Sequence, residues 1–207
     1  MKRNKVSHYV IGFTGGIGSG KSTILQAIKE RYDIHLIEAD KVGSMLLEKD
    51  HRLYYALIKE YGLQVLNDDL TLNKEKVSQI AFKDQASQKR INEIEHPVIK
   101  TFIVKGIAHT IRQFVFVEAA LLFEGGLDTL CDEIISVTAD RETRIQRLMS
   151  GRRYTREKCE SIIDKQMTDE EFRMRSTVVF DNSGPIFETL QNVFDYLDNL
   201  GVPMNEE

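Results

Sequence analysis

The stretch GFTGGIGSGKST, residues 12–23, limits the possible folds of this chain more than any other feature. Gly15, Gly20, Lys21 and Ser22 match the pattern G-x-x-x-x-G-K-[ST]. In that pattern backbone N–H groups bind nucleotide phosphates, the lysine reaches the β and γ oxygens, and the hydroxyl ligates Mg²⁺. The residues expected to contact the nucleotide are Gly16, Ile17, Gly18, Ser19, Gly20, Lys21, Ser22 and Thr23.

The segments on either side of this stretch have the order that a phosphate-binding loop requires. The apolar run YVIGFT (9–14) is typical of a strand buried on both faces, and KSTILQAIKERY (21–32) has helical periodicity. We therefore expect a parallel α/β sheet that binds a mononucleotide. The dinucleotide pattern G-x-G-x-x-G fails here, and the N-K-x-D motif of a switch GTPase is absent from the sequence.

The composition indicates an ordinary globular protein. The chain has 207 residues, 42% of them hydrophobic, and its net charge of −4 argues against a protein that coats nucleic acid. No apolar run approaches the length of a membrane-spanning helix, and Cys131 and Cys159 form no CxxC pair. We expect a cytoplasmic protein with reduced thiols. The five histidines show no paired metal spacing, so no metal is expected beyond Mg²⁺ bound with the nucleotide.

Asp40 follows a second strand-like run, IHLIEA (34–39). Ligands bind at the carboxyl ends of parallel strands, so this carboxylate could take the proton of an attacking hydroxyl. Aspartate is also a favoured N-cap, and a helical pattern, KVGSMLLEK, follows directly. The spacing alone does not decide between the two roles.

Residues 50–113 contain only helix-patterned segments. Asn73 suits a helix cap, and Pro97 suits the first turn of a new helix. We expect a helical insertion between the second and third strands that shapes an acceptor pocket.

Three further apolar runs predict the remaining strands: FVFVE (114–118), EIISVTA (133–139) and TVVFD (177–181), with a final helix after Pro185. Glu118 closes the first of these runs and could hold Mg²⁺ through water. The alternative for Glu118 is a solvated or capped loop residue.

Residues 141–158 carry seven basic and two acidic side chains, in a chain that is acidic overall. Arg144 and Arg147 are three apart and can share one helical face. Such charge runs are usually solvated surfaces. Next to a phosphate-binding loop they also suit a lid, whose arginines close over the nucleotide and stabilise the charged transition state, with Gly151 as a hinge.

Taken in order, these motifs resemble those of the dephospho-CoA kinase family over nearly the whole chain. The family's TGGIGSGKST stands intact at 14–23. The other matches are the strand-end Glu38-Ala39-Asp40, the step His96-Pro97, the segment EAALLFE (118–124), the lid residues Arg147, Leu148, Arg152, Gln166 and Met167, and the ending DNSG (181–184). The chain departs from the family pattern at Glu38 and Glu118, where aspartate is usual, at Ala120, where proline is usual, and at Ser176-Thr177, where Ala-Asp is common.

The resemblance implies roles for individual residues. Asp40 would be the general base for the 3′-hydroxyl of dephospho-CoA, with Lys21, Arg147 and Arg152 as the catalytic cations. Ser22 and Glu118 would hold Mg²⁺, and Asn182 and Gly184 would lie near the adenine of ATP. The residues that would bind the acceptor are Asp40, His96, Glu118 and Leu121.

The expected architecture is a three-layer α/β sandwich of the P-loop NTPase type with a parallel central sheet, a helical insertion and a lid. Residues 1–49 and 114–207 would form the nucleotide-binding core, 50–113 the acceptor domain and 141–175 the lid. The expected reaction is transfer of a phosphoryl group from ATP to dephospho-CoA by a monomer or small homo-oligomer, without nucleic acid or membrane as a partner. The alternatives are another small nucleoside or nucleotide kinase, and a nucleotide-sensing ATPase that binds nucleic acid through the basic segment.

Overall fold

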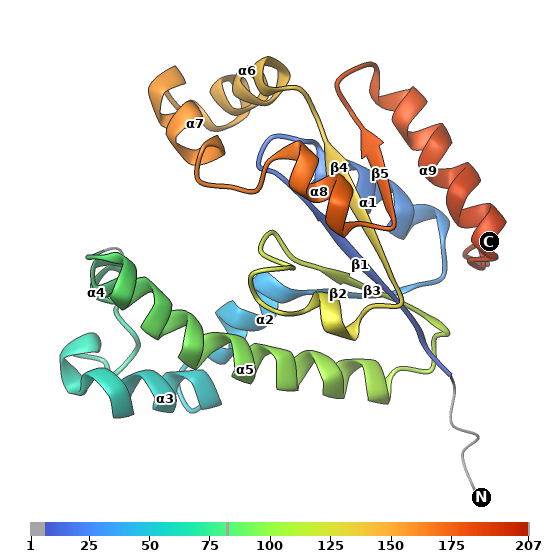
Figure 1. Ribbon diagram of the computed structural model, residues 1–207. Helices are drawn as coiled ribbons and strands as arrows, with labels where there is room; N and C mark the ends of the chain where they lie inside the picture. The colour runs from blue at the N-terminus through green and yellow to red at the C-terminus, as the bar shows by residue number, and fades with distance from the viewer. Residues whose placement is uncertain (1–6, 82, 207) are drawn as a thin grey trace, which may run out of the picture.

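The computed structural model describes residues 7–81 and 83–206, and its centre is a parallel sheet of five strands (Figure 1). The strands are β1 (Tyr9–Gly15), β2 (His35–Glu38), β3 (Phe114–Glu118), β4 (Glu133–Thr138) and β5 (Val178–Asp181). Their order in the sheet is β2-β3-β1-β4-β5, and every neighbouring pair is parallel. This arrangement confirms the predicted fold class.

Helices connect the strands. They are α1 (Lys21–Arg31), α2 (Ala39–Leu46), α3 (Arg52–Tyr61), α4 (Lys74–Ala81), α5 (Gln85–His109), α6 (Arg141–Arg152), α7 (Arg156–Ile163), α8 (Asp169–Arg175) and α9 (Ile186–Leu200), with short 3₁₀ turns at Leu63–Val65 and Asp128–Leu130. Asn73 accepts from the N–H of Lys76 at the start of α4, as predicted for a cap. None of the helices in the described ranges is long and apolar enough to cross a lipid bilayer.

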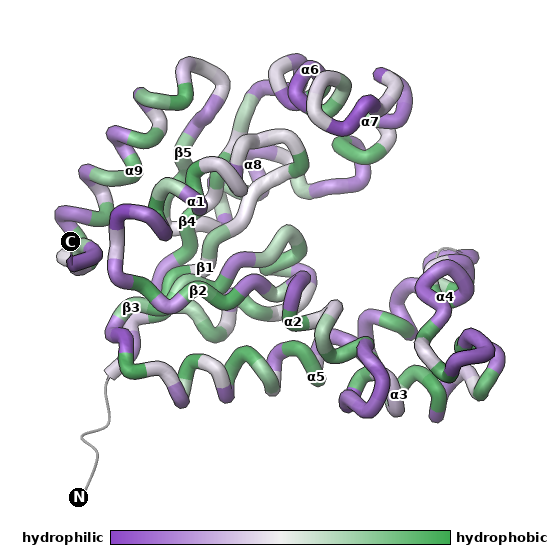
Figure 2. Tube along the Cα trace, turned by 180° about the vertical axis from the view of Figure 1, so that it is seen from behind, coloured by the Kyte–Doolittle hydropathy of each residue, from purple (hydrophilic) through white to green (hydrophobic). Residues whose placement is uncertain are grey.

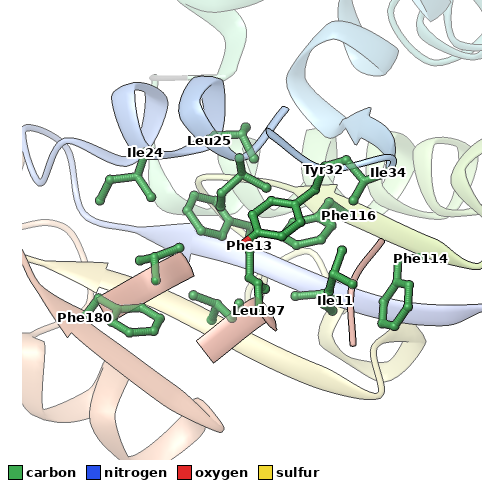
Figure 3. Packing of buried hydrophobic residues seen from close by; sticks show 14 of the residues in the cluster. Ile11, Phe13, Ile24, Leu25, Tyr32, Ile34, Phe114, Phe116, Phe180 and Leu197 are labelled. Atoms are coloured by element: carbon green, nitrogen blue, oxygen red, sulfur yellow. The ribbon is translucent and has the colours of Figure 1, made fainter. Parts of the chain in front are cut away.

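Helices cover both faces of the sheet. On one face, α1 and α9 pack against the central strands (Figure 3). The ring centroids of Phe13 on β1 and Phe116 on β3 lie 6.4 Å apart there. On the other face, Val115 and Val117 of β3 pack against α2 and α5. Strands buried on both faces have continuous apolar sequences, which explains why the runs at 9–14 and 114–118 could be recognised.

The segment between β2 and β3 is helical. In Figure 1, α3 and α4 lie beside the N-terminal part of α5 and project away from the sheet. A separate hydrophobic cluster, which includes Tyr54, Leu57 and Val65, holds them together. Hydrophilic and hydrophobic residues alternate along α5 and α9 (Figure 2), as expected for helices with one face on a core.

The prediction that a new helix begins at Pro97 is wrong. Pro97 lies inside α5, which runs without interruption for 25 residues. A proline there has no N–H to offer the carbonyl of Glu93, four residues earlier. Ile91 and Ile103 of α5 are both buried, one on each side of the proline, so packing keeps the two halves in one helix.

Candidate active site

The turn between β1 and α1, residues 15–22, forms what we call the phosphate loop. Gly18 and Gly20 have φ values of +79° and +91°, which side chains with a Cβ rarely adopt. A Cβ at Gly18 would lie 2.9 Å from the carbonyl oxygen of Arg144, and one at Gly20 would lie 2.2 Å from Nδ2 of Asn182. Both glycines are therefore required by the conformation of the loop and by close neighbours.

Several N–H groups of the phosphate loop are available to an anion. Within the residues that the structure describes, the N–H groups of Gly18, Gly20, Lys21 and Ser22 donate to no protein acceptor. Backbone N–H groups at a helix N-terminus that lack partners form an anion site, because their dipoles point the same way. The loop is thus suited to bind phosphate.

Three residues expected at the phosphates use their N–H groups elsewhere. Ile17 donates to Oε1 of Gln166 at 2.8 Å, Ser19 to the carbonyl of Gly16 at 3.2 Å, and Thr23 to the carbonyl of Gly20 at 3.1 Å. The sequence pattern does not reveal these bonds, because it identifies a loop and not the direction of each peptide.

Lys21 and Glu118 form an ion pair at the carboxyl end of the sheet. Nζ of Lys21 contacts Oε1 of Glu118, which is the last residue of β3. Glu118 is 7% exposed, so the alternative of a solvated loop residue is wrong. Next to it, the hydroxyl of Thr14 donates to the carbonyl of Ala119 at 2.8 Å, which ties the ends of β1 and β3 together.

Asp40 lies in the first turn of α2, and it is not the N-cap of that helix. The cap position belongs to Glu38, because α2 starts at Ala39, directly after β2. Asp40 is exposed, and its carboxylate makes no hydrogen bond or ion pair with any residue that the structure describes. The capping alternative is therefore wrong, and the carboxylate is free to act on a ligand.

A cavity of about 270 Å³, which we call the acceptor cavity, opens beside Asp40. It is lined by Ala39, Asp40, Gly43, Ser44, Leu47, Asn92, Glu95, His96, Ile99, Ala119, Leu121, Gly125 and Leu127. Three residues proposed for acceptor binding, Asp40, His96 and Leu121, thus come together from α2, α5 and the segment after β3. A second hollow of about 790 Å³ continues along α5 and shares His96 with the cavity.

Two titratable groups of this cavity are affected by their surroundings. Burial lowers the pKa of His96, against a smaller opposing effect of Glu124, so the imidazole favours its neutral form. Burial also raises the pKa of Glu95. Both effects follow from the loss of water around a charge.

Arg147 and Asn182 support the phosphate loop from α6 and from the end of β5. Nη1 of Arg147 donates to the carbonyls of Gly18 and Ser19 at 3.5 and 3.3 Å, and its Nη2 donates to the carbonyl of Asn182 at 2.8 Å. Nδ2 of Asn182, which is 1% exposed, donates to the carbonyl of Ser19 at 2.7 Å. Since C=O and N–H point in opposite directions in a trans peptide, this bond directs the N–H of Gly20 away from Asn182.

The structure also places Arg152 and Gly151, which were predicted for a lid, and Gly184, which was predicted to lie near adenine. Arg152 is exposed at the end of α6 and forms no ion pair or side-chain hydrogen bond within residues 7–81 and 83–206. Gly151, the predicted hinge, lies inside α6, and the residue that ends the helix with φ of +54° is Arg153. Gly184 lies in the turn between β5 and α9.

Two residues at the loop, Arg144 and Gln166, were noted in the sequence motifs but were not assigned to the site. Arg144 is 4% exposed and packs against Gly16, and Gln166 accepts the N–H of Ile17. The shared face of Arg144 and Arg147 was a correct prediction, because both side chains reach the loop. A run of arginines looks like a solvated surface, so the burial of Arg144 had no signal in the sequence.

Comparison with known proteins agrees with this geometry. The family model of dephospho-CoA kinase matches residues 9–188. A dephospho-CoA kinase of Lactobacillus johnsonii is 33% identical over 196 residues, which are 93% of this chain and 98% of that protein. The dephospho-CoA kinase of Listeria innocua is 31% identical over 191 residues, 91% of this chain and 95% of that protein.

Solved structures share the fold. A protein of Thermus thermophilus has a TM-score of 0.77 and 25% identity, and the match covers 92% of this chain and 96% of that one. A dephospho-CoA kinase from Campylobacter jejuni has a TM-score of 0.65 at 20% identity, with the same coverage of both chains. A shikimate kinase from Bacteroides thetaiotaomicron has a TM-score of 0.52 at 13% identity, over 92% of this chain and 98% of that one, which shows the P-loop kinase fold alone.

The family model covers most of the chain, and curated relatives more than 30% identical extend along nearly all of it. The chain therefore belongs to the dephospho-CoA kinase family.

Proposed function

We propose that this protein transfers the γ-phosphoryl group of ATP to the 3′-hydroxyl of dephospho-CoA, which yields ADP and coenzyme A. The observation that carries the proposal is the position of Asp40. Its carboxylate has no protein partner among the described residues and lines a cavity whose wall includes Ala119. Ala119 directly follows Glu118, the partner of Lys21. Acceptor cavity and phosphate loop thus adjoin at the carboxyl ends of β1, β2 and β3, where such sheets bind ligands.

The residues of the loop fit a nucleoside triphosphate with Mg²⁺. The free N–H groups of Gly18, Gly20, Lys21 and Ser22 would bind phosphate oxygens. The hydroxyl of Ser22 and the carboxylate of Glu118 would hold Mg²⁺, since oxygen ligands suit this ion. When bound, Mg²⁺ neutralises charge on the phosphates.

Catalysis by this chain would rest on alignment and charge. Asp40 would accept the proton of the acceptor hydroxyl, a contribution of about 10²–10⁴-fold to the rate for a positioned base. Lys21 would leave Glu118 and contact the transferring phosphoryl group. Arg147 would hold the loop in place through the carbonyls of Gly18 and Ser19.

We assign the helical segment 50–113 to acceptor binding, because α5 supplies His96 to the cavity. The segments 1–49 and 114–207 would bind the nucleotide, with 141–175 as the lid. Both cysteines are free thiols, in keeping with a reducing compartment such as the cytoplasm. Neither of the two alternatives, another small kinase or a nucleic-acid-binding ATPase, has a specific observation in its favour.

The test is ADP release by the purified protein with Mg-ATP, with and without dephospho-CoA. We expect dephospho-CoA to be required for rapid turnover. Asp40→Asn should lose about 10²–10⁴-fold of that rate while it binds ATP normally. Asp68→Asn, a change at an exposed aspartate outside the cavity, is the matched control and should behave as the wild type.

Two results would count against the proposal. If dephospho-CoA leaves ADP release unchanged, the assignment of the acceptor fails. If Asp40→Asn and Asp68→Asn retain equal rates, the acceptor assignment stands and Asp40 is not the base.

A further inference from the structure

Ile17, within the phosphate loop, is held through both of its backbone groups. Its N–H donates to Oε1 of Gln166 at 2.8 Å, and its carbonyl accepts from Nε of Arg144 at 2.9 Å. The two side chains are also joined to each other, because Nη2 of Arg144 donates to the same Oε1 at 3.0 Å. Ile17, Arg144 and Gln166 thus form a closed set of three hydrogen bonds, which we call the Ile17 anchor.

The side chain of Ile17 strengthens the same connection. It packs against a hydrophobic cluster formed by Ile145 and Leu148 of α6 with Cys159 and Ile163 of α7. The phosphate loop is therefore attached to α6 and α7 by an apolar contact as well as by the Ile17 anchor. Gln166 lies between α7 and α8, so three segments of the chain meet at one residue of the loop.

Arg144 is a buried cation directly beside the loop. Only 4% of the residue is exposed, and a Cβ at Gly16 would lie 2.5 Å from its Nη2. Its nearest carboxylate is that of Asp169, with 3.8 Å between Nη1 and Oδ1. Burial lowers the pKa of the Arg144 guanidinium, and the carboxylate of Asp169 acts in the opposite direction. The guanidinium of Arg144 is therefore held mainly by its hydrogen bonds to the carbonyl oxygen of Ile17 and to Oε1 of Gln166, and less by the more distant carboxylate of Asp169.

The anchor determines the direction of an N–H group that the phosphate needs. The carbonyl of Ile17 and the N–H of Gly18 belong to one planar peptide and point in opposite directions. When Arg144 holds that carbonyl, the N–H of Gly18 must point away from Arg144. This N–H is one of the four that have no protein acceptor in the described part of the chain. Gly18 could otherwise rotate freely, because it has no Cβ.

We propose that Arg144 and Gln166 are positioning residues, which act through Ile17 to hold the phosphate loop in its nucleotide-binding conformation. This inference rests on the proposed use of the loop for ATP. It adds that the loop depends on α6 and on the segment after α7 for its shape. Both hydrogen bonds to Gln166 need only an acceptor oxygen, and this allows a specific test.

The test compares Gln166→Met, which removes the acceptor at similar size, with Gln166→Glu, which keeps it. We expect Gln166→Met to bind Mg-ADP about tenfold more weakly in calorimetry, the result of losing a partly buried hydrogen bond. KM for ATP should rise, and KM for dephospho-CoA should stay unchanged. Gln166→Glu should bind Mg-ADP as the wild type does. Gln191→Met, on the exposed side of α9, is the control for the substitution itself.

A second measurement needs no ligand. Hydrogen exchange of the Ile17 amide should be slow in the wild type and in Gln166→Glu, and fast in Gln166→Met. Arg144→Lys keeps a charge but cannot reach Ile17 and Gln166 together, so it should also weaken Mg-ADP binding.

Either of two results overturns the inference: wild-type affinity for Mg-ADP in Gln166→Met, or equal weakening in Gln166→Glu and Gln166→Met. Binding of Mg-ADP is measured without the acceptor. A protein that binds Mg-ADP but does not phosphorylate dephospho-CoA would contradict the proposed reaction and leave this inference standing.

Discussion

Lys21 and Glu118 contact each other across 97 positions of the sequence, and neither is well exposed. Each charge of such a pair is tolerated because the other is present. Removal of one partner leaves a poorly solvated charge behind, which costs more than the pair itself contributes. In the free protein the pair also keeps the lysine at the end of β3, beside the phosphate loop.

Glu118→Gln should therefore lower the free energy of unfolding of the nucleotide-free protein by about 3 kcal/mol. Urea denaturation measures this change. Glu38→Gln is the matched control, since the partner of Glu38 is the exposed Lys41 and such a pair is worth at most about 1 kcal/mol. Equal losses of unfolding free energy in the two variants would show that the Lys21–Glu118 pair stabilises the fold no more than the exposed Lys41–Glu38 pair does.

At the level of single residues, sequence reasoning could select Asp40 and Glu118 because each follows a strand-like run. Ligands bind at the carboxyl ends of parallel strands, so each carboxylate was a candidate for the site. It could not detect that the N–H of Ile17 is already bonded, or that Arg144 is buried. Both facts depend on how single peptide groups and side chains are oriented. The sequence pattern predicts only that a loop or a helix forms there.

Among the elements, α5 is the one whose structure differs most from expectation. Pro97 lies in its middle, although a proline inside a helix costs about 3 kcal/mol relative to alanine. The proline also borders the hollow that continues from the acceptor cavity. Pro97 thus forms part of the wall of this hollow.

Pro97→Ala should accordingly stabilise the protein, by about 1–3 kcal/mol in urea denaturation, because Ala restores the missing N–H. At the same time KM for the acceptor should rise, since the wall of the hollow changes. Pro203→Ala, outside any helix, should destabilise slightly through the unfolded state. A loss of stability in Pro97→Ala would mean that the surrounding structure is adapted to the proline.

Strands and helices were otherwise predictable from periodicity. The buried strands have continuous apolar runs, and the caps and glycines mark the ends of several helices. A helix boundary was wrongly predicted at Pro97 because a proline is common in the first turn of a helix, and the packing on both sides of it keeps α5 continuous.

For the molecule as a whole, the two histidines with lowered pKa predict how stability changes with pH. Burial is the main cause of the lowered pKa for both His35 and His96. As pH falls below the ordinary value of 6.5, the unfolded chain takes up protons that the folded protein does not. The contribution of these two histidines to the free energy of unfolding should therefore decrease from pH 7 toward about pH 5.5.

Urea denaturation at a series of pH values checks this prediction. A variant with both His35→Asn and His96→Asn should lose less stability over the same interval than the wild type. If the two proteins have parallel pH profiles, the histidines are not the groups responsible.

The bond between Asn182 and Ser19 joins positions 163 residues apart. Because β1 pairs only with β3 and β4, the phosphate loop is also flanked by strands that are synthesised much later. A nascent chain cannot complete the loop until β5 has emerged, and contacts of such high sequence separation form late in folding. A ligand that binds the completed loop therefore stabilises the folded chain as a whole relative to the unfolded chain.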